Sequence, residues 1–180
     1  VVEDVVRIPP HRFGEDLRRV VVTELQRAYR ERFYDPELGI IISVLDAEVE
    51  PVGKVVYGDG ATYHRAKITL LTYKPELQEV VEGEVIDVRD FGLIVRIGPV
   101  DAFLHKSQII DDYVLYDRSR GMLYGKNTKR TICVGDPIRA RIIAVSTGGK
   151  GIPVKVGLTA RQPFLGKPEW IEEEIKRVSR

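Results

Sequence analysis

The sequence predicts two small domains of different class, an α+β domain in residues 1–80 and an all-β domain in residues 81–180. The first part holds one long stretch with the apolar spacing of an amphipathic helix, flanked by strand-like runs. The second part is a series of short apolar runs separated by glycines, which favours a small closed barrel. The charge balance also differs, because residues 1–80 carry 11 basic and 14 acidic side chains whereas residues 81–180 carry 17 and 13.

Composition places the chain among globular proteins and limits its chemistry. Of the 180 residues, 43% are hydrophobic and 31% are charged, which is unlike a disordered chain. No apolar run of about 18 residues predicts a membrane span, and the start lacks the pattern of a secretion signal. A single cysteine, Cys133, excludes an intramolecular disulfide and a multi-cysteine zinc site. We therefore expect a soluble, cytoplasmic protein.

The first domain is expected to contain one helix over Glu15–Phe33. Glu15 and Asp16 are placed in its first turn, where the helix dipole favours anions, and Asp35-Pro36 ends it. One apolar stripe runs along the predicted helix at i, i+4, i+8 and i+11: Leu17, Val21, Leu25 and Ala28.

Strands are expected around this helix in a small, mostly antiparallel sheet. Val5–Ile8 is a short strand, and Ile40–Leu45 is apolar enough to be buried on both faces. If Ile40-Ile41-Ile42 were instead partly exposed, these aliphatic side chains would suit a protein interface. Gly58-Asp59-Gly60 is a hairpin signal that leads into an alternating strand over Tyr63–Tyr73.

The second domain is expected to form a five-stranded barrel and a short terminal helix over Trp170–Val178. Asp111–Arg130 is interpreted as a long polar loop inserted between the third and fourth strands. The five strands are predicted at Gly83–Val88, Leu93–Ile97, Ala102–His105, Pro137–Val145 and Val154–Thr159.

No catalytic, metal-binding or cofactor-binding set stands out. The three histidines, His11, His64 and His105, are too far apart in the sequence to indicate a shared metal site. Thr147–Gly151 is only loosely similar to a phosphate-binding loop, and its place between two strands favours a hairpin turn. A nuclease remains an alternative because three carboxylates stand close together in the sequence: Asp111, Asp112 and Asp117.

Positive charge is concentrated between Arg118 and Arg161. This segment contains ten basic residues and one acid, Asp136. Such a bias indicates a surface that binds a polyanion, with a merely solvated charged face as the alternative.

Residues 83–109 carry the most specific motif. Gly83 opens the first strand, Phe91-Gly92 precedes the second, and Leu104-His105-x-Ser107 follows the third. Val134-Gly135-Asp136 and Leu158-Thr159 complete the pattern. In this order and spacing the segment resembles the S-one (S1) domain, an RNA-binding OB-fold barrel, with one departure: Ile94 stands where many family members have a second aromatic residue.

The resemblance implies an RNA-binding face that carries Phe91 and His105. Strand alternation places Phe103 on the same face as His105, although a core position for Phe103 and a structural role for His105 are alternatives. Basic side chains would add contacts to phosphates. The predicted RNA-binding residues are Phe91, Arg96, Phe103, His105, Arg139, Arg141 and Lys155.

The first domain narrows the resemblance further. A series of short motifs precedes the S1 pattern, and their order resembles that in the archaeal RNA polymerase stalk subunits of the RpoE type and their eukaryotic counterparts. The motifs are Val6–Pro10, Phe13-Gly14, Gly58-Asp59-Gly60, Tyr73-Lys74-Pro75 and Glu79–Gly83.

That resemblance implies an RNP-like tip domain in residues 1–80 that docks on the polymerase core, and a small helical partner protein that completes the stalk. It also implies a non-catalytic subunit that binds emerging single-stranded RNA and supports DNA melting at initiation and elongation. No cofactor is implied. Turn chemistry makes one set of residues candidates for core docking: Pro9, Pro10, Gly58, Asp59 and Gly60. An S1 adaptor in translation or RNA degradation is the alternative.

Overall fold

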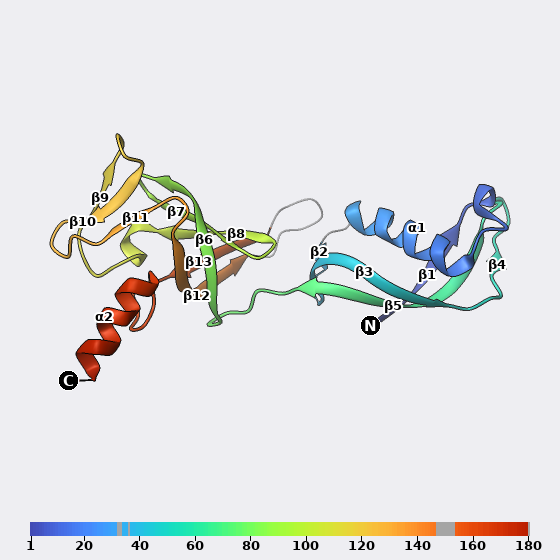
Figure 1. Ribbon diagram of the computed structural model, residues 1–180. Helices are drawn as coiled ribbons and strands as arrows, with labels where there is room; N and C mark the ends of the chain where they lie inside the picture. The colour runs from blue at the N-terminus through green and yellow to red at the C-terminus, as the bar shows by residue number, and fades with distance from the viewer. Residues whose placement is uncertain (32–33, 36, 147–153, 180) are drawn as a thin grey trace. The chain divides into compact units, whose positions relative to one another are not determined.

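A computed structural model describes residues 1–31, 34–35, 37–146 and 154–179, so the predicted Thr147–Gly151 turn lies outside the described residues. The chain divides into two compact units, Val1–Lys74 and Pro75–Arg180 (Figure 1). Val80, where the charge pattern divides the sequence, is the first residue of strand β6.

The first unit is an antiparallel sheet covered on one face by a helix, which confirms the α+β class. Its strand order is β1-β5-β3-β2, and β4 pairs with β5. The core lies between helix and sheet and includes Val21, Leu25 and Ile68. The elements are β1 (Val2–Ile8), the 3-10 turn η1 (Pro10–Arg12), α1 (Leu17–Glu31), β2 (Tyr34–Asp35), β3 (Gly39–Val49), β4 (Lys54–Val55) and β5 (Thr62–Tyr73).

Helix α1 begins at Leu17, the first residue of its apolar stripe, and not at Glu15 as predicted. The placement of Glu15 and Asp16 inside its first turn is wrong, because both precede Leu17. The Asp16 carboxylate accepts a hydrogen bond from the Arg19 backbone N–H at 2.8 Å, as an N-cap residue does. Glu15 pairs instead with Arg12 at 3.0 Å. The anions therefore act as a cap and a surface pair in front of the helix.

Strand β3 is not buried on both faces as the sequence predicts. Ile42 is 49% exposed and Leu45 is 59% exposed. The β3–β5 register shifts between Ile41 and Ser43 and again between Val44 and Asp46, so both exposed residues lie at irregularities that break the alternation. The structure therefore supports the alternative in which the apolar run of β3 is partly exposed.

The second unit is built on a closed barrel in the order β12-β13-β8-β7-β6, which confirms the five predicted strands. Gly83 is needed in β6 because a Cβ there would stand 2.5 Å from the Arg96 carbonyl oxygen of β7. The barrel and its flanking turns and helix comprise β6 (Val80–Arg89), β7 (Gly92–Ile97), β8 (Val100–His105), the 3-10 turn η2 (Lys106–Gln108), β12 (Pro137–Ser146), β13 (Lys155–Thr159) and α2 (Pro168–Val178).

The interpretation of Asp111–Arg130 as a polar loop is wrong. The segment contains β9 (Val114–Asp117) and β10 (Met122–Gly125), which form a three-stranded antiparallel sheet with β11 (Thr131–Cys133). Val114, Leu123 and Ile132 are buried. These few apolar residues suffice because they share the inner face of a short sheet. We call this element the inserted sheet.

Asp112 fixes the turn beside the inserted sheet. Its carboxylate accepts hydrogen bonds from the backbone N–H groups of Thr128 at 2.7 Å, Asn127 at 2.9 Å and Tyr113 at 2.6 Å. The Thr128 hydroxyl also donates to it at 2.9 Å. These donors, the Thr128 backbone N–H first, lower the pKa of Asp112 to about 2. The carboxylate is therefore a structural group of the fold.

Replacing Asp112→Asn should lower the midpoint of thermal unfolding at neutral pH, because an amide cannot accept all of these hydrogen bonds. The folded-state pKa lies below the unfolded value of about 3.9, so the ionised group stabilises the fold above that pH and the advantage disappears as the pH falls toward 2. Thermal unfolding between pH 7 and about pH 2 measures the difference between variant and wild type. Asp111→Asn, at a more exposed neighbouring carboxylate, is the control; an equal effect in both would contradict this role.

Candidate nucleic-acid interface

The alternation of β7 and β8 divides their side chains between the barrel core and an outer surface. Leu93, Val95 and Leu104 point into the core and are fully buried. Ile94 and Arg96 point outward from β7 and lie opposite Phe103 and Asp101 of β8 in the strand register. Phe103 is therefore a half-buried residue of the outer surface and not a core residue.

Three aromatic rings meet on this surface and form what we call the aromatic face: Phe91, Phe103 and His105. The Phe91 and Phe103 ring centroids are 5.8 Å apart, and those of Phe103 and His105 are 6.1 Å apart. Phe91 is 45% exposed. Rings at these distances, exposed on a sheet, offer a platform on which unpaired bases can stack.

Backbone and side-chain contacts hold the aromatic face in place. The Lys106 backbone N–H donates to the Phe91 carbonyl oxygen at 3.0 Å, joining the β6–β7 turn to the end of β8. His105 Nδ1 accepts the Ser107 backbone N–H at 3.2 Å, so this histidine also caps η2. The predicted structural role of His105 and its place on the outer surface are thus both present.

Arg89 is a member of this surface that sequence reasoning missed. Its guanidinium lies 5.9 Å from the Phe91 ring centroid, within the range of a cation–π contact. The only signal in the sequence is its position two residues before Phe91, at the end of a strand that turns back on itself.

Two of the predicted basic residues are engaged in ion pairs. Arg96 donates two hydrogen bonds to Asp101, at 2.9 and 3.2 Å. Arg139 donates two to Glu82, at 2.8 and 2.6 Å. These partners neutralise much of the charge that each arginine offers to a phosphate.

Arg141 and Lys155 are the predicted basic residues whose charge no described carboxylate neutralises. Arg141 is half-buried, and its Nε is the one buried side-chain donor without a hydrogen-bond partner among the described residues. Lys155 is exposed and has no ion pair with any residue that the structure describes. Because no described carboxylate neutralises either side chain, both can contribute positive charge toward a phosphate.

The predicted docking residues of the first unit come together around the β4–β5 connection. A Cβ on Gly60 would stand 3.4 Å from the Pro10 ring, so the two turns are adjacent. Asp59 accepts two hydrogen bonds from Arg7, both at 2.8 Å, and one from the Tyr63 hydroxyl at 2.7 Å. The Arg7 contact, first of all, lowers the pKa of Asp59. Asp59 therefore holds the turn in place by joining it to Arg7 and Tyr63, and we call this group of contacts the clamp.

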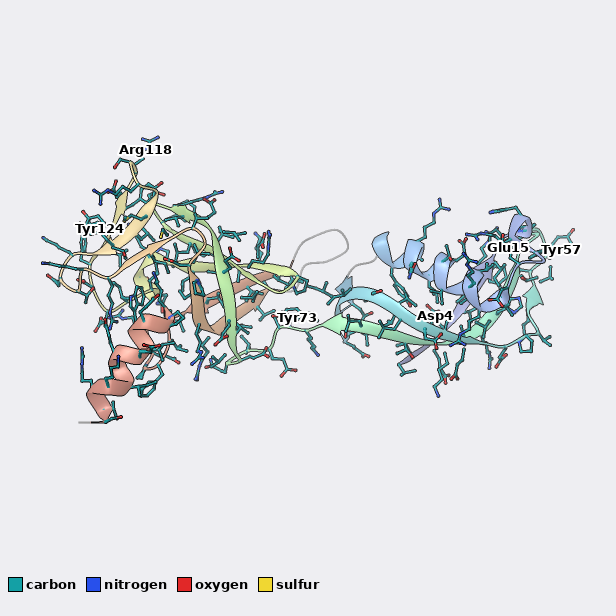
Figure 2. The ribbon with its side chains drawn as sticks, viewed as in Figure 1. Asp4, Glu15, Tyr57, Tyr73, Arg118 and Tyr124 are labelled. Atoms are coloured by element: carbon teal, nitrogen blue, oxygen red, sulfur yellow. The ribbon has the colours of Figure 1, made fainter. Side chains whose placement is uncertain are left out.

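Exposed apolar side chains beside this clamp were missed by sequence reasoning. Val55 is 71% exposed, Val56 is 49% exposed and the Tyr57 side chain is fully exposed. Figure 2 shows Tyr57 at the end of the first unit, pointing away from the sheet. We call Val55–Gly60 the tip loop.

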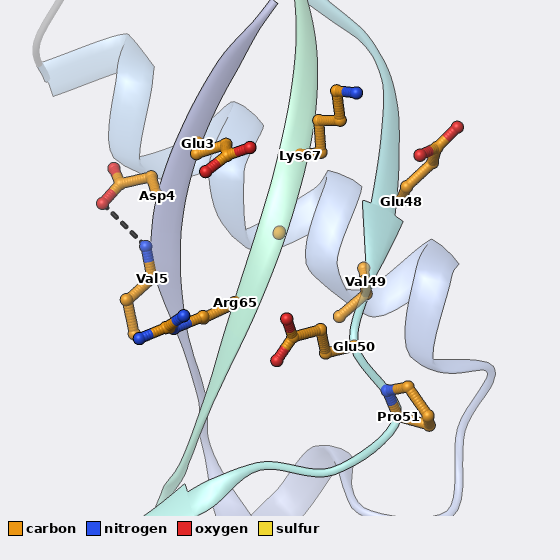
Figure 3. Close-up of a pocket in the computed structure, with 10 residues that line it drawn as sticks. Glu3, Asp4, Val5, Glu48, Val49, Glu50, Pro51, Arg65 and Lys67 are labelled. Atoms are coloured by element: carbon orange, nitrogen blue, oxygen red, sulfur yellow. Dashed lines mark hydrogen bonds between the residues drawn. The ribbon is translucent and has the colours of Figure 1, made fainter.

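A shallow pocket of about 600 Å³ lies on the sheet face of the first unit (Figure 3). Glu3 of β1 and Glu48 of β3 are both register neighbours of Lys67 in β5. Carboxylates outnumber basic groups in its lining, so this face repels a polyanion.

Neither described helix is long and apolar enough to cross a membrane. Within the described ranges no group of three or more His, Cys, Asp or Glu side chains is placed to hold a metal ion. Asp111 contacts Arg161, and Asp117 accepts from Ser119 and Arg120 in the β9–β10 turn. With Asp112 in its own turn, the three carboxylates that raised the nuclease alternative each have a separate structural partner.

Comparison with known proteins agrees with the two-unit division. The model of the S1 RNA binding domain matches residues 74–157. The model of the SHS2 domain found in the N terminus of Rpb7p/Rpc25p/MJ0397 matches residues 3–60. Fold and matches together define a two-domain protein in which an SHS2 domain precedes an S1 barrel.

Relatives make the assignment more specific. The chain is 43% identical, over 96% of its length and 95% of that protein, to DNA-directed RNA polymerase subunit Rpo7 of Saccharolobus shibatae. It is 24% identical to DNA-directed RNA polymerase III subunit RPC8 of Saccharomyces cerevisiae, over 78% of this chain and 68% of that one. Ribonuclease R of Buchnera aphidicola is 30% identical over only 45% of this chain and 11% of its own. The chain belongs to the Rpo7 family of RNA polymerase subunits.

Asp59→Asn should loosen the tip loop, because it removes the negative charge and one of the two oxygens that accept from the Arg7 guanidinium and the Tyr63 hydroxyl. Hydrogen exchange of the backbone amide of Ala61, which also donates to Asp59, should be several-fold faster than in the wild type. Arg65→Gln, at an exposed arginine of the same sheet, is the control. Unchanged protection at Ala61 in the Asp59 variant would show that the clamp does not hold the loop.

Proposed function

We propose that this chain is a non-catalytic subunit of a DNA-directed RNA polymerase that binds the emerging single-stranded transcript through its S1 barrel. The observation that carries the proposal is the match to an Rpo7 subunit over nearly the whole of both chains. The alternative of an S1 adaptor in RNA degradation has weaker support, because the ribonuclease match covers less than half of this chain.

RNA binding on the aromatic face would combine stacking with contacts to the phosphates. Phe91 and Phe103 offer rings on which bases stack without sequence preference. Arg141 and Lys155 supply charge that is not already neutralised by described carboxylates. Ile94 stands opposite Phe103 where another ring would add a stacked base, so binding of moderate strength is expected.

Protein contacts are proposed for two separate surfaces of the first unit. The tip loop presents Tyr57 and Val55 on a clamped scaffold, which suits docking on the polymerase core. Ile42 and Leu45 form an exposed apolar patch on β3, and Leu71, 46% exposed, lies beside them as the register partner of Ser43. This patch suits the small helical partner of the stalk.

The role in transcription follows from this arrangement. As part of the polymerase stalk in the cytoplasm, the chain would receive RNA near the exit channel and support DNA melting at initiation and the later elongation. Family membership supports this role, and the exposed aromatic and apolar surfaces supply the contacts that it requires.

Phe103→Ala should weaken binding of short single-stranded RNA by roughly tenfold, because one stacked base contributes about 1–3 kcal/mol. Arg141→Ala should weaken it too and should reduce the salt dependence by about 0.7 in the logarithmic slope for each phosphate that Arg141 neutralises. Fluorescence anisotropy across a salt series measures both effects. Phe103→Tyr keeps a ring and is the matched control. Wild-type affinity in both alanine variants would exclude this face.

Affinity purification from the native cell tests the protein contacts, and two variants serve as controls for each other. Tyr57→Ser in the tip loop should reduce recovery of the large polymerase subunits while the small helical partner still co-purifies. Leu45→Lys on β3 should abolish the complex with that partner in gel filtration, because it places a charge where the proposed interface would bury an apolar side chain. If both variants lost the same partner, the two surfaces would not be separate. If the wild-type chain co-purified with no polymerase subunits, the proposed function would be excluded.

A further inference from the structure

The inserted sheet presents two exposed tyrosines on its outer face. Tyr113 is 68% exposed and Tyr124 is 37% exposed. Tyr124 pairs with Leu115 in the strand register, and the Lys126 backbone N–H donates to the Tyr113 carbonyl oxygen at 3.0 Å, which extends the register by one step. Alternation then puts both tyrosines and Lys126 on one face, with the rings diagonal to each other.

The other face of the same sheet explains why these rings stay outside. Leu123 and Ile132 are register partners and are buried, as is Val114. The sheet thus has one apolar face that belongs to the fold and one face that presents aromatic residues to the solvent.

Basic side chains gather on the inserted sheet, and the three acids of the segment, Asp111, Asp112 and Asp117, are each engaged by an ion pair or hydrogen bonds. Residues 118–130 contain five basic side chains and no acid. Arg118, Lys126 and Lys129 are exposed and form no ion pair with a described residue, and Figure 2 shows Arg118 at the tip of the inserted sheet. Arg96 and Arg139 of the barrel, in contrast, are paired with carboxylates. Three basic side chains without an ion pair to a described residue therefore lie together on the insertion, in addition to Arg141 and Lys155 of the barrel.

The surrounding turns are held in one conformation before any ligand arrives. Asp112 fixes the turn that carries Asn127 and Thr128. Asp117 accepts hydrogen bonds from the backbone N–H groups of Ser119, at 2.9 Å, and Arg120, at 3.2 Å, in the opposite turn. Fixed turns lower the entropy cost of placing Lys126 and Arg118 against phosphates.

We propose that the outer face of the inserted sheet is a second contact surface for single-stranded RNA, with bases stacked on Tyr113 and Tyr124. Lys126, Lys129 and Arg118 contact the phosphates between them. The proposal rests on the proposed function of the barrel as an RNA-binding domain, and it extends the bound strand beyond the aromatic face. Exposed rings interleaved with unpaired basic groups on a sheet are the combination that sequence-tolerant recognition of single strands requires.

The test compares two RNA lengths on the full chain: about 8 nucleotides, which one barrel can cover, and about 24 nucleotides, which exceed it. The double variant Tyr113→Ala with Tyr124→Ala should bind the longer RNA about tenfold more weakly and the shorter RNA as the wild type does. Lys126→Gln with Lys129→Gln should reduce the salt slope for the longer RNA by about 1.4.

Matched variants separate stacking from general effects. Tyr113→Phe with Tyr124→Phe keeps both rings and should bind both RNAs normally, as should Phe13→Ala and Lys54→Gln in the first unit; thermal unfolding confirms that each variant is folded. Wild-type affinity of the double alanine variant for the longer RNA would overturn the proposal. Phe103→Ala distinguishes the two sites, because it should weaken both lengths. If it changes neither while the tyrosine variant still weakens the longer RNA, the aromatic face fails and the inserted sheet stands.

Discussion

The structure of the second unit depends on the closure of a five-stranded barrel, since closure leaves each strand only one inner and one outer face. Leu93, Val95 and Leu104 must fill the interior, and they are fully buried. Every second residue is then forced outward whatever its chemistry. Phe103 and His105 are on the surface for this reason, and the exposure of an aromatic cluster follows from the packing of its neighbours.

Carboxylates decide which positive charges remain available to a ligand. A count along the sequence treats Arg96, Arg139 and Lys126 alike, but the fold pairs the first two with Asp101 and Glu82. Asp59 and Asp112 are likewise used inside turns, where hydrogen-bond donors hold their pKa values low. Net charge per domain gives the sign of the field, whereas the accessible unpaired groups determine where a phosphate can bind.

Sequence patterns predicted what depends on near neighbours along the chain. The five barrel strands and most of the α1 stripe follow from periodicity, which local spacing displays directly: Leu17, Val21 and Leu25 face the core, whereas Ala28 is exposed. The exposure of Ile42 and Leu45 did not follow, because register shifts against β5 turn an apolar run outward. The partner of Arg139 is 57 residues away, so no local pattern reveals that pair. The inserted sheet was missed because polar residues dominate a segment in which few apolar ones are sufficient.

The two types of exposed surface differ in chemistry, and this difference supports the different ligands proposed for them. On the inserted sheet, Tyr113 and Tyr124 stand among unpaired lysines, and a ring that must stay accessible to bases is kept soluble by such neighbours. On β3, Ile42 and Leu45 are aliphatic and offer no π-face for a base, so their exposure is relieved only by another apolar surface. For these two patches, exposed rings among unpaired cations favour nucleic acid, and exposed aliphatic side chains favour a protein partner. The chemistry of each patch therefore distinguishes surfaces that overall exposure treats as equal.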